Sequence, residues 1–74
     1  MNFTIRLVYP DVHIEEIIPA DKIEVFTAGH TNPHVPPEGG LVYFANGKEG
    51  LIHDGIAYVM NTQGKTVAKY NFTM

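Results

Sequence analysis

His30 and His34 stand four residues apart and are the first residues of the chain whose types and spacing could do chemistry. Imidazole binds zinc and titrates near neutral pH, so two rings held together could ligate a metal ion or move protons. On a helix this spacing would place both rings on one face, but Pro33 disfavours helical backbone at the residue before it. Because a closed zinc site needs four well-placed ligands and the sequence joins only two, we expect neither a metal nor another cofactor.

The best candidate for acid–base chemistry is Glu38, which shares one segment with His30 and His34. If the loop brought His30 and His34 together around a metal ion, His13, His53 or Glu38 could be the third ligand. A chain of 74 residues, however, leaves little volume for a substrate cleft of the usual size. We therefore expect no catalytic residues and a protein that is not an enzyme.

Residue types and their order exclude other reaction classes. The chain has no serine and no cysteine, so it lacks the usual acyl-transfer nucleophiles. Gly39 and Gly40 lead into an expected strand rather than a helix, which does not fit a phosphate-binding loop. Glu15 and Glu16 are adjacent in another expected strand, so they face opposite ways and cannot flank one glycosidic bond.

The elements that must position these groups have the two-residue alternation of short strands. Residues 3–9 alternate apolar and polar side chains, and Pro10–Asp11 suits a type I turn, so residues 12–18 should return antiparallel. The neighbouring carboxylates Glu15 and Glu16 indicate either a bulge or an edge strand in this second segment. A second turn is expected at residues 19–22, before a third strand.

The C-terminal half carries the stronger hairpin signals. Asn46–Gly47 is the dipeptide that a type I′ turn prefers, because both of its central residues need positive φ. Asp54–Gly55 repeats this signal further along the chain. These turns predict a four-strand meander, with strands over residues 41–45, 51–53, 56–61 and 66–72.

The sequence thus predicts one all-β domain over residues 1–74, a small antiparallel barrel or a strongly curled sheet of about six to seven short strands. It consists of an N-terminal hairpin and the C-terminal meander. A strand that begins at Phe3 and another that ends near Phe72 suggest that both ends of the chain lie at sheet edges. Another chain could add to such an edge, and we expect a homo-oligomer.

The segment from His30 to Gly40 holds two histidines, three prolines and two glycines and follows no repeating hydrophobic pattern. Prolines reduce the freedom of a loop before it binds, and loops on rigid scaffolds often carry recognition. The sequence predicts a stiff, solvent-facing, hydrogen-bonding loop that makes the specific contacts of this protein.

The aromatic side chains are spread over nearly every expected strand, and most must form the core. Some of them cannot face inward together. Tyr43 and Phe44 are consecutive, as are Val25 and Phe26, so each pair sends its members to opposite faces. Part of this apolar area is therefore either a second core layer or a contact surface.

Charge and composition narrow the classes of partner. Residues 1–37 hold two basic and five acidic side chains, whereas residues 38–74 hold three of each, so the formal charge of −3 belongs to the N-terminal half. Neither half supplies the concentrated positive face that nucleic-acid binding requires. No apolar run approaches the roughly 20 residues needed to cross a bilayer, and the first residues show no export signal. We expect a cytoplasmic protein that binds neither nucleic acid nor membrane.

The leading hypothesis is a small, non-enzymatic binding module that acts by protein–protein interaction. Short, compact, cysteine-free chains of this kind resemble accessory or inhibitor proteins of bacteriophages, which act by occupying a host protein, although no motif here identifies a family. The alternative is a protein that binds or sequesters a small molecule or nucleotide at a subunit interface. The residues expected to bind are His30, Asn32, His34, Glu38, Tyr43, His53 and Tyr58.

Overall fold

The computed structural model describes residues 2–73, and within them it contains seven β-strands and no helix. The predicted all-β class and the upper end of the predicted strand number are confirmed. No helix in this part of the chain is long and apolar enough to span a membrane. The strands are β1 (Phe3–Tyr9), β2 (Ile14–Ala20), β3 (Lys22–Thr27), β4 (Gly39–Ala45), β5 (Lys48–Ile52), β6 (Ile56–Met60) and β7 (Thr66–Asn71).

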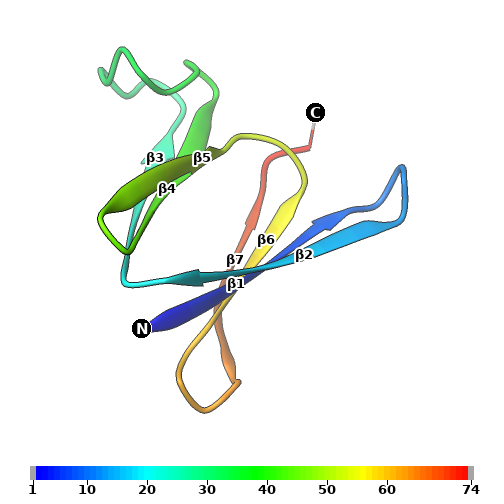
Figure 1. Ribbon diagram of the computed structural model, residues 1–74. Helices are drawn as coiled ribbons and strands as arrows, with labels where there is room; N and C mark the ends of the chain where they lie inside the picture. Colours follow the sequence, from blue (N-terminus) through cyan, green and yellow to red (C-terminus); the bar gives the residue numbers. More distant parts are fainter. Residues whose placement is uncertain (1, 74) are drawn as a thin grey trace.

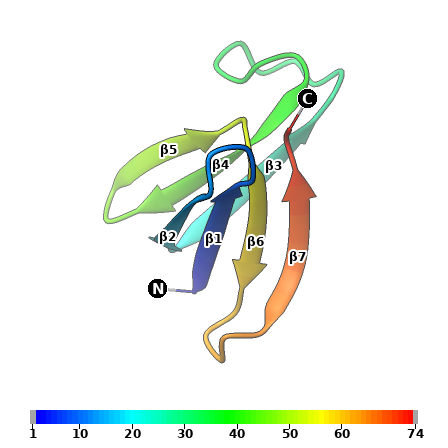
Figure 2. The same cartoon turned by 90° about the vertical axis from the view of Figure 1, so that its right-hand side faces the viewer.

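The strands form two antiparallel sheets rather than one (Figures 1 and 2). The four-stranded sheet has the order β2-β1-β6-β7, and the three-stranded sheet has the order β3-β4-β5. Within residues 2–73 no strand pairing closes these sheets into a barrel, so the closed barrel among the predicted architectures is not found. β7 lies at a sheet edge as expected, but β1 lies between β2 and β6, so the expectation of an edge position for the N-terminal strand is wrong.

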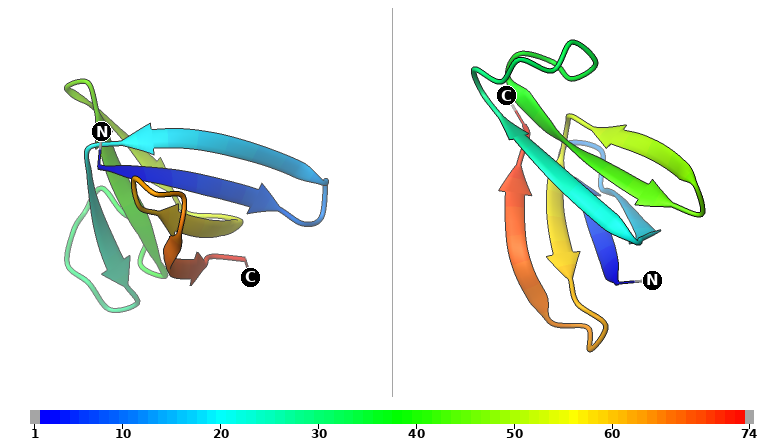
Figure 3. Two further views of the ribbon diagram at one scale, coloured as in Figure 1. Left: turned by 90° about the horizontal axis from the view of Figure 1, so that it is seen from below. Right: turned by 90° about the vertical axis from the view of Figure 1, so that its left-hand side faces the viewer.

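Both dipeptides lie in the predicted hairpin turns, but the first turn continues through His13, whose φ is 55°, so β2 begins at Ile14 and not at residue 12. In the first hairpin the Val12 N–H donates to the Tyr9 carbonyl at 3.3 Å, which closes the turn through Pro10 and Asp11. In the hairpin of β4 and β5, Asn46 and Gly47 have φ values of 53° and 76°, as a type I′ turn requires. The first hairpin extends beyond the rest of the molecule (Figure 3).

The predicted turn at residues 19–22 is wrong, because Pro19 and Ala20 continue β2 and pair with Thr4 and Phe3. Only Asp21 separates β2 from β3, and its N–H donates to the Phe44 carbonyl at 2.7 Å. One nearly continuous stretch of chain therefore belongs to both sheets. Proline fits here because β2 is an edge strand, as the adjacent carboxylates had indicated.

The predicted four-strand meander is also wrong, because β6 pairs with β1 and β7 and not with β5. The chain changes sheets at His53–Gly55. Gly55 has a φ of 80°, and a Cβ atom there would lie 2.8 Å from the Val8 carbonyl oxygen. The link thus passes directly against β1, which only glycine permits, and β6 emerges beside β1.

The core lies between the two sheets and is filled by alternate residues of their facing strands. Ile5, Leu7 and Val59 come from the four-stranded sheet, and Leu41 and Ile52 come from the three-stranded sheet. The residues between them in sequence form the two outer faces, which differ in character. Outward side chains on the four-stranded sheet include Arg6, Tyr58 and Lys69, and those on the three-stranded sheet include Phe26, Val42, Phe44 and Leu51.

Candidate functional site

The loop between β3 and β4 holds its shape through the ring of His30. The Nε2–H group of His30 donates to the Pro36 carbonyl at 2.6 Å, and its Nδ1 accepts the Asn32 N–H at 3.0 Å. Both bonds together require the neutral ring with the proton on Nε2. Asn32 in turn accepts the His34 N–H through Oδ1 at 2.9 Å. The half-buried His30 therefore organises the loop from within and is not among its exposed groups.

Val35 attaches the loop to the outer face of the three-stranded sheet. Its side chain is only 5 % exposed, although it lies in a segment with no strand or helix. A Cβ atom on Gly40 would lie 3.4 Å from Val35 Cγ1 and 3.1 Å from Leu51 Cδ1, so the absent side chain of Gly40 makes room for the loop. The Phe26 and His30 rings meet edge to face, with centroids 5.4 Å apart.

The prediction of a stiff, hydrogen-bonding loop thus agrees with these contacts, but the loop is only partly solvent-facing. Thr31, Pro33, His34, Pro37 and Glu38 are exposed. The remaining residues of the segment form hydrogen bonds within the loop or contact the three-stranded sheet. The exposed positions can contact a partner, and the others fix where those positions stand.

A groove of about 350 Å³ runs between this loop and the outer face of the three-stranded sheet. We call it the loop groove. Its floor is apolar and its rim carries polar and acidic groups from the loop and from β3 and β5. The lining residues are Glu24, Phe26, Asn32, His34, Val35, Val42, Phe44, Glu49, Gly50 and Leu51.

One end of the loop groove already binds an ammonium group from its own chain. Lys22 Nζ lies 5.4 Å from the centroid of the Phe44 ring and 3.2 Å from Glu24 Oε1. Glu49 pairs with Phe44 across β4 and β5, which places a second carboxylate beside the same ring. An aromatic face next to carboxylates is a favourable setting for a cation.

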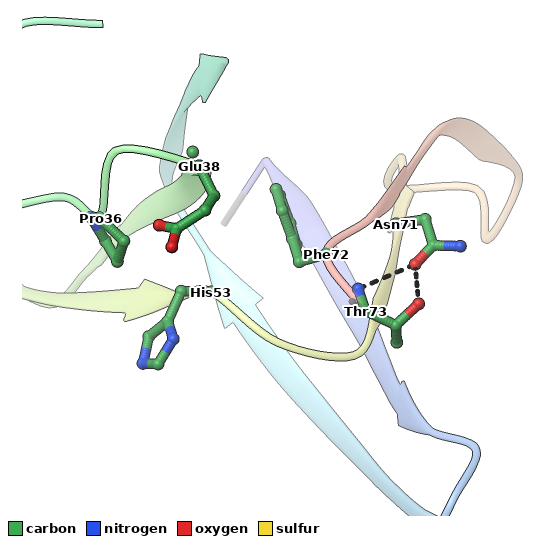
Figure 4. Close-up of a pocket in the computed structure, with 7 residues that line it drawn as sticks. Pro36, Glu38, His53, Asn71, Phe72 and Thr73 are labelled. Atoms are coloured by element: carbon green, nitrogen blue, oxygen red, sulfur yellow. Dashed lines mark hydrogen bonds between the residues drawn. The ribbon is translucent and has the colours of Figure 1, made fainter. Parts of the chain in front are cut away.

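A second, smaller cleft of about 220 Å³ lies between the sheets and contains two of the predicted residues, Glu38 and His53. Pro36, Glu38 and His53 lie on one side of it, and residues 71–73 lie on the other (Figure 4). The side-chain oxygen of Asn71 accepts the Thr73 N–H at 2.9 Å. Within residues 2–73 no group of three or more histidine, aspartate or glutamate side chains is placed to hold a metal ion.

The two predicted tyrosines lie elsewhere. Tyr43 is half-buried against the core, and its ring occupies the space that a side chain at Gly50 would need. Tyr58 lies on the outer face of the four-stranded sheet, with Arg6 and Lys69 at 5.6 Å and 5.7 Å from its ring centroid. The seven predicted binding residues therefore do not form one site. Only Asn32 and His34 line the loop groove, and His30 supports it.

Sequence reasoning did not name the floor of the loop groove. The sequence did indicate that Phe26 and Phe44 face outward, because each is adjacent in its strand to a residue that faces the core. Val42 and Leu51 carried none that distinguishes them from ordinary strand residues. The acidic rim residues Glu24 and Glu49 looked like solvated strand positions, and only the strand pairing brings them beside the aromatic floor.

We compared the chain with protein-family models, curated proteins and solved structures. No family model matches the chain, and neither a curated protein nor a solved structure matches it.

Proposed function

We propose that this protein is a non-enzymatic binding module that holds a segment of another protein in the loop groove. The observation that carries the proposal is an apolar floor of four outward side chains, roofed on one side by a pre-ordered loop and rimmed by carboxylates. A volume of about 350 Å³ falls in the range of roughly 300–1,000 Å³ that is usual for binding pockets. It accommodates one or two side chains of a partner, not a whole domain.

The lining predicts the chemistry of that segment. Phe26, Val42 and Leu51 favour an aliphatic or aromatic side chain, because burying apolar surface contributes about 25 cal/mol per Å². Glu24 and Glu49 favour a basic side chain next to it. The contact of Lys22 with Phe44 and Glu24 supports this choice, because the same ring and carboxylate already hold an ammonium group of the chain itself.

The internal bonds of the loop lower the entropy that binding has to overcome. His30 already fixes the backbone at Asn32 and Pro36, and Val35 already rests on the sheet. A loop that is ordered before it meets its partner loses less conformational freedom on docking. Few contacts therefore suffice for affinity, which suits so small a protein.

In this proposal the protein acts by occupying a surface of its partner, as a phage-type accessory or inhibitor protein in the cytoplasm would. Its negative N-terminal half repels nucleic acid and attracts a basic partner surface. No reaction is required for this role.

The alternative, a small-molecule or nucleotide binder, has less support. The cleft that joins Glu38 and His53 measures about 220 Å³, which is below the usual range for a nucleotide-sized ligand. His53 and the predicted tyrosines also lie apart from each other. A nucleotide or metabolite that raises the melting temperature would favour this alternative over the first.

Selection of peptides from a displayed random library on the purified protein tests the leading proposal. We expect the selected peptides to share an apolar residue next to lysine or arginine. Leu51→Asp, on the groove floor, should weaken their binding by at least roughly tenfold. Val12→Asp is the matched control, because Val12 is 59 % exposed at the distant tip of the first hairpin.

Circular dichroism would establish that both variants are folded. Peptides that bind the Leu51→Asp variant as well as they bind the unmodified protein would contradict the proposal. A selection that yields peptides without basic residues would contradict the assigned chemistry while leaving the groove itself as the contact site.

A further inference from the structure

The four-stranded sheet has two free edges, β2 and β7, and both carry exposed apolar side chains. Ile17 on β2 is 58 % exposed and Val67 on β7 is 54 % exposed, and Ile14 on β2 is also exposed. Both strands lie outermost in their sheet, β2 in the left view of Figure 3 and β7 in the right view. Free strand edges with apolar side chains readily pair with another chain.

The two edges have opposite charge. β2 carries Glu16 and also Glu15, whose carboxylate is paired with Arg6 of the same molecule at 2.7 Å, whereas β7 carries Lys69 and follows Lys65. In registers that set Glu15 or Glu16 against its counterpart, two β2 edges would bring carboxylates opposite one another, and two β7 edges aligned at Lys69 would do the same with ammonium groups. Like charges directly opposite in a sheet are destabilising, whereas opposite charges stabilise it. The charges therefore disfavour pairing of either edge with itself and favour pairing of β2 with β7.

Strand direction permits this pairing. All neighbours in the four-stranded sheet are antiparallel, so its first and last strands run in opposite directions. When β7 of one molecule lies beside β2 of the next, the two strands are antiparallel as well, and the sheet continues without interruption.

Backbone alternation fixes which groups face outward. The Phe72 N–H donates inward to the Gly55 carbonyl at 2.8 Å, so the backbone groups of Lys69 and Asn71, at alternate positions, face the free edge. Pro19 has no N–H to donate to β1, so its position faces the other free edge, and Glu15 and Ile17 share its orientation.

One register satisfies these constraints together. Placing Lys69 opposite Glu15 of the next molecule aligns two outward-facing backbone positions and joins opposite charges. The same register sets Tyr70 opposite Ile14 and brings Val67, the extra residue at the irregularity in β7, near Ile17. The exposed side chains of Val67 and Ile17 thus come together beside the charged pair.

We propose that this protein assembles head to tail with further copies of itself, the β7 edge of one molecule pairing with the β2 edge of the next. Such an interface is heterologous, so it produces a closed ring if the rotation between copies closes and a filament if it does not. The loop groove lies on the outer face of the other sheet and remains open in this assembly. The inference is independent of what the groove binds.

Charge exchange tests the pairing. In sedimentation or light scattering at millimolar concentration we expect the unmodified chain to form species larger than a monomer, and we expect Lys69→Glu and Glu15→Lys each to reduce them at least tenfold. The double variant should restore assembly, because each altered edge then meets the other. Lys48→Glu, on β5 of the other sheet, is the matched control for a reversed charge and should assemble normally.

Cysteine cross-linking identifies the partner edges, since the chain contains no cysteine of its own. We expect a mixture of Ile17→Cys and Val67→Cys proteins to form disulfide-linked dimers on mild oxidation, while each protein alone forms few. A chain that remains monomeric at millimolar concentration would overturn the proposal. So would equal cross-linking of either protein with itself, because that is the result for a two-fold symmetric contact.

Discussion

The outer faces of the two sheets are built by the same alternation of side chains, but the loop between β3 and β4 lies on only one of them, that of the three-stranded sheet. On the four-stranded sheet, Arg6 and Lys69 lie against the Tyr58 ring, and Arg6 also pairs with Glu15 at 2.7 Å. On the three-stranded sheet the outward residues are mainly apolar, and Val35 of the loop covers only part of them. Such pairs occur on both faces, since Lys22 also lies over Phe44 and pairs with Glu24. The comparison teaches that the faces differ in cover: Gly40 leaves room for Val35 of the loop on the three-stranded sheet, and the four-stranded sheet has no such loop contact within residues 2–73.

Of the substitutions that test this comparison, Gly40→Val should lower the free energy of unfolding most, because it removes the room that the loop uses on the three-stranded sheet. Its Cβ atom would lie 2.9 Å from the Ile52 carbonyl oxygen, and its methyl groups would take the place of Val35. Overpacking of this kind costs about 1–3 kcal/mol, and we expect a value near the upper end. Urea unfolding measures the loss; an unchanged midpoint would show that the loop does not rest on Gly40.

Val35→Ala should destabilise the protein by about 1.5 kcal/mol, because two buried methyl groups are removed. Val67→Ala, the same change on β7 of the four-stranded sheet, should stay within about 0.5 kcal/mol, because Val67 is largely exposed. Urea unfolding of the pair compares the two sheets directly. Equal losses would mean that the loop contributes nothing to covering its sheet.

His30→Ala should cost about 1 kcal/mol and release the loop while leaving both sheets intact, because it removes two hydrogen bonds inside the loop. Hydrogen exchange of the Asn32 amide is the specific measurement, and it should accelerate. His34→Ala is the control, because the His34 side chain is exposed and only its backbone N–H is bonded. Equal exchange rates in both variants would remove His30 from its positioning role.

The smallest effect concerns the ion pair on the four-stranded sheet. The hydrogen bond from Arg6 holds the pKa of Glu15 below its ordinary value. A lowered pKa in the folded state adds stability that is present above the unfolded pKa and is lost as the pH falls through the folded pKa. The stability difference between the unmodified protein and Glu15→Gln should therefore disappear in acid, below a pH of about 4.

Glu16→Gln controls for this measurement, since Glu16 is the neighbouring position without the Arg6 contact. Chemical unfolding at a series of pH values provides the comparison. A difference between Glu15→Gln and the unmodified protein that persists undiminished in acid would contradict the assignment to the ion pair.

Strand positions could be predicted because the side-chain alternation is local. The alternation over residues 3–9 predicted β1. Asn46–Gly47 predicted the hairpin of β4 and β5, because asparagine and glycine are the residues that most readily adopt the positive φ values that this turn needs. Strand partners could not be predicted in the same way. Asp54–Gly55 signals a sharp change of direction, but whether the next strand returns to β5 or crosses to β1 depends on packing against Val8 that the dipeptide does not encode.

The site was predicted in part for a related reason. Prolines and histidines marked the loop correctly, because composition shows where regular structure stops. The role of Val35 could not be predicted from the sequence, because a single apolar residue in a loop belongs to no repeating hydrophobic pattern that would mark it as buried. His30 was expected to contact a partner, but its two ring nitrogens are used within the loop. The floor of the loop groove exists only once β3, β4 and β5 are paired.

The short link at Asp21 has a consequence for how the molecule can deform. The chain passes between the sheets only twice within residues 2–73, at Asp21 and at His53–Gly55. Any tilt of one sheet against the other must be absorbed by the backbone torsions of these few residues. Asp21 joins the edge strand β2 directly to β3, which borders the loop groove, whereas His53–Gly55 leads from β5 to the interior strand β6, so the two links load different parts of the four-stranded sheet.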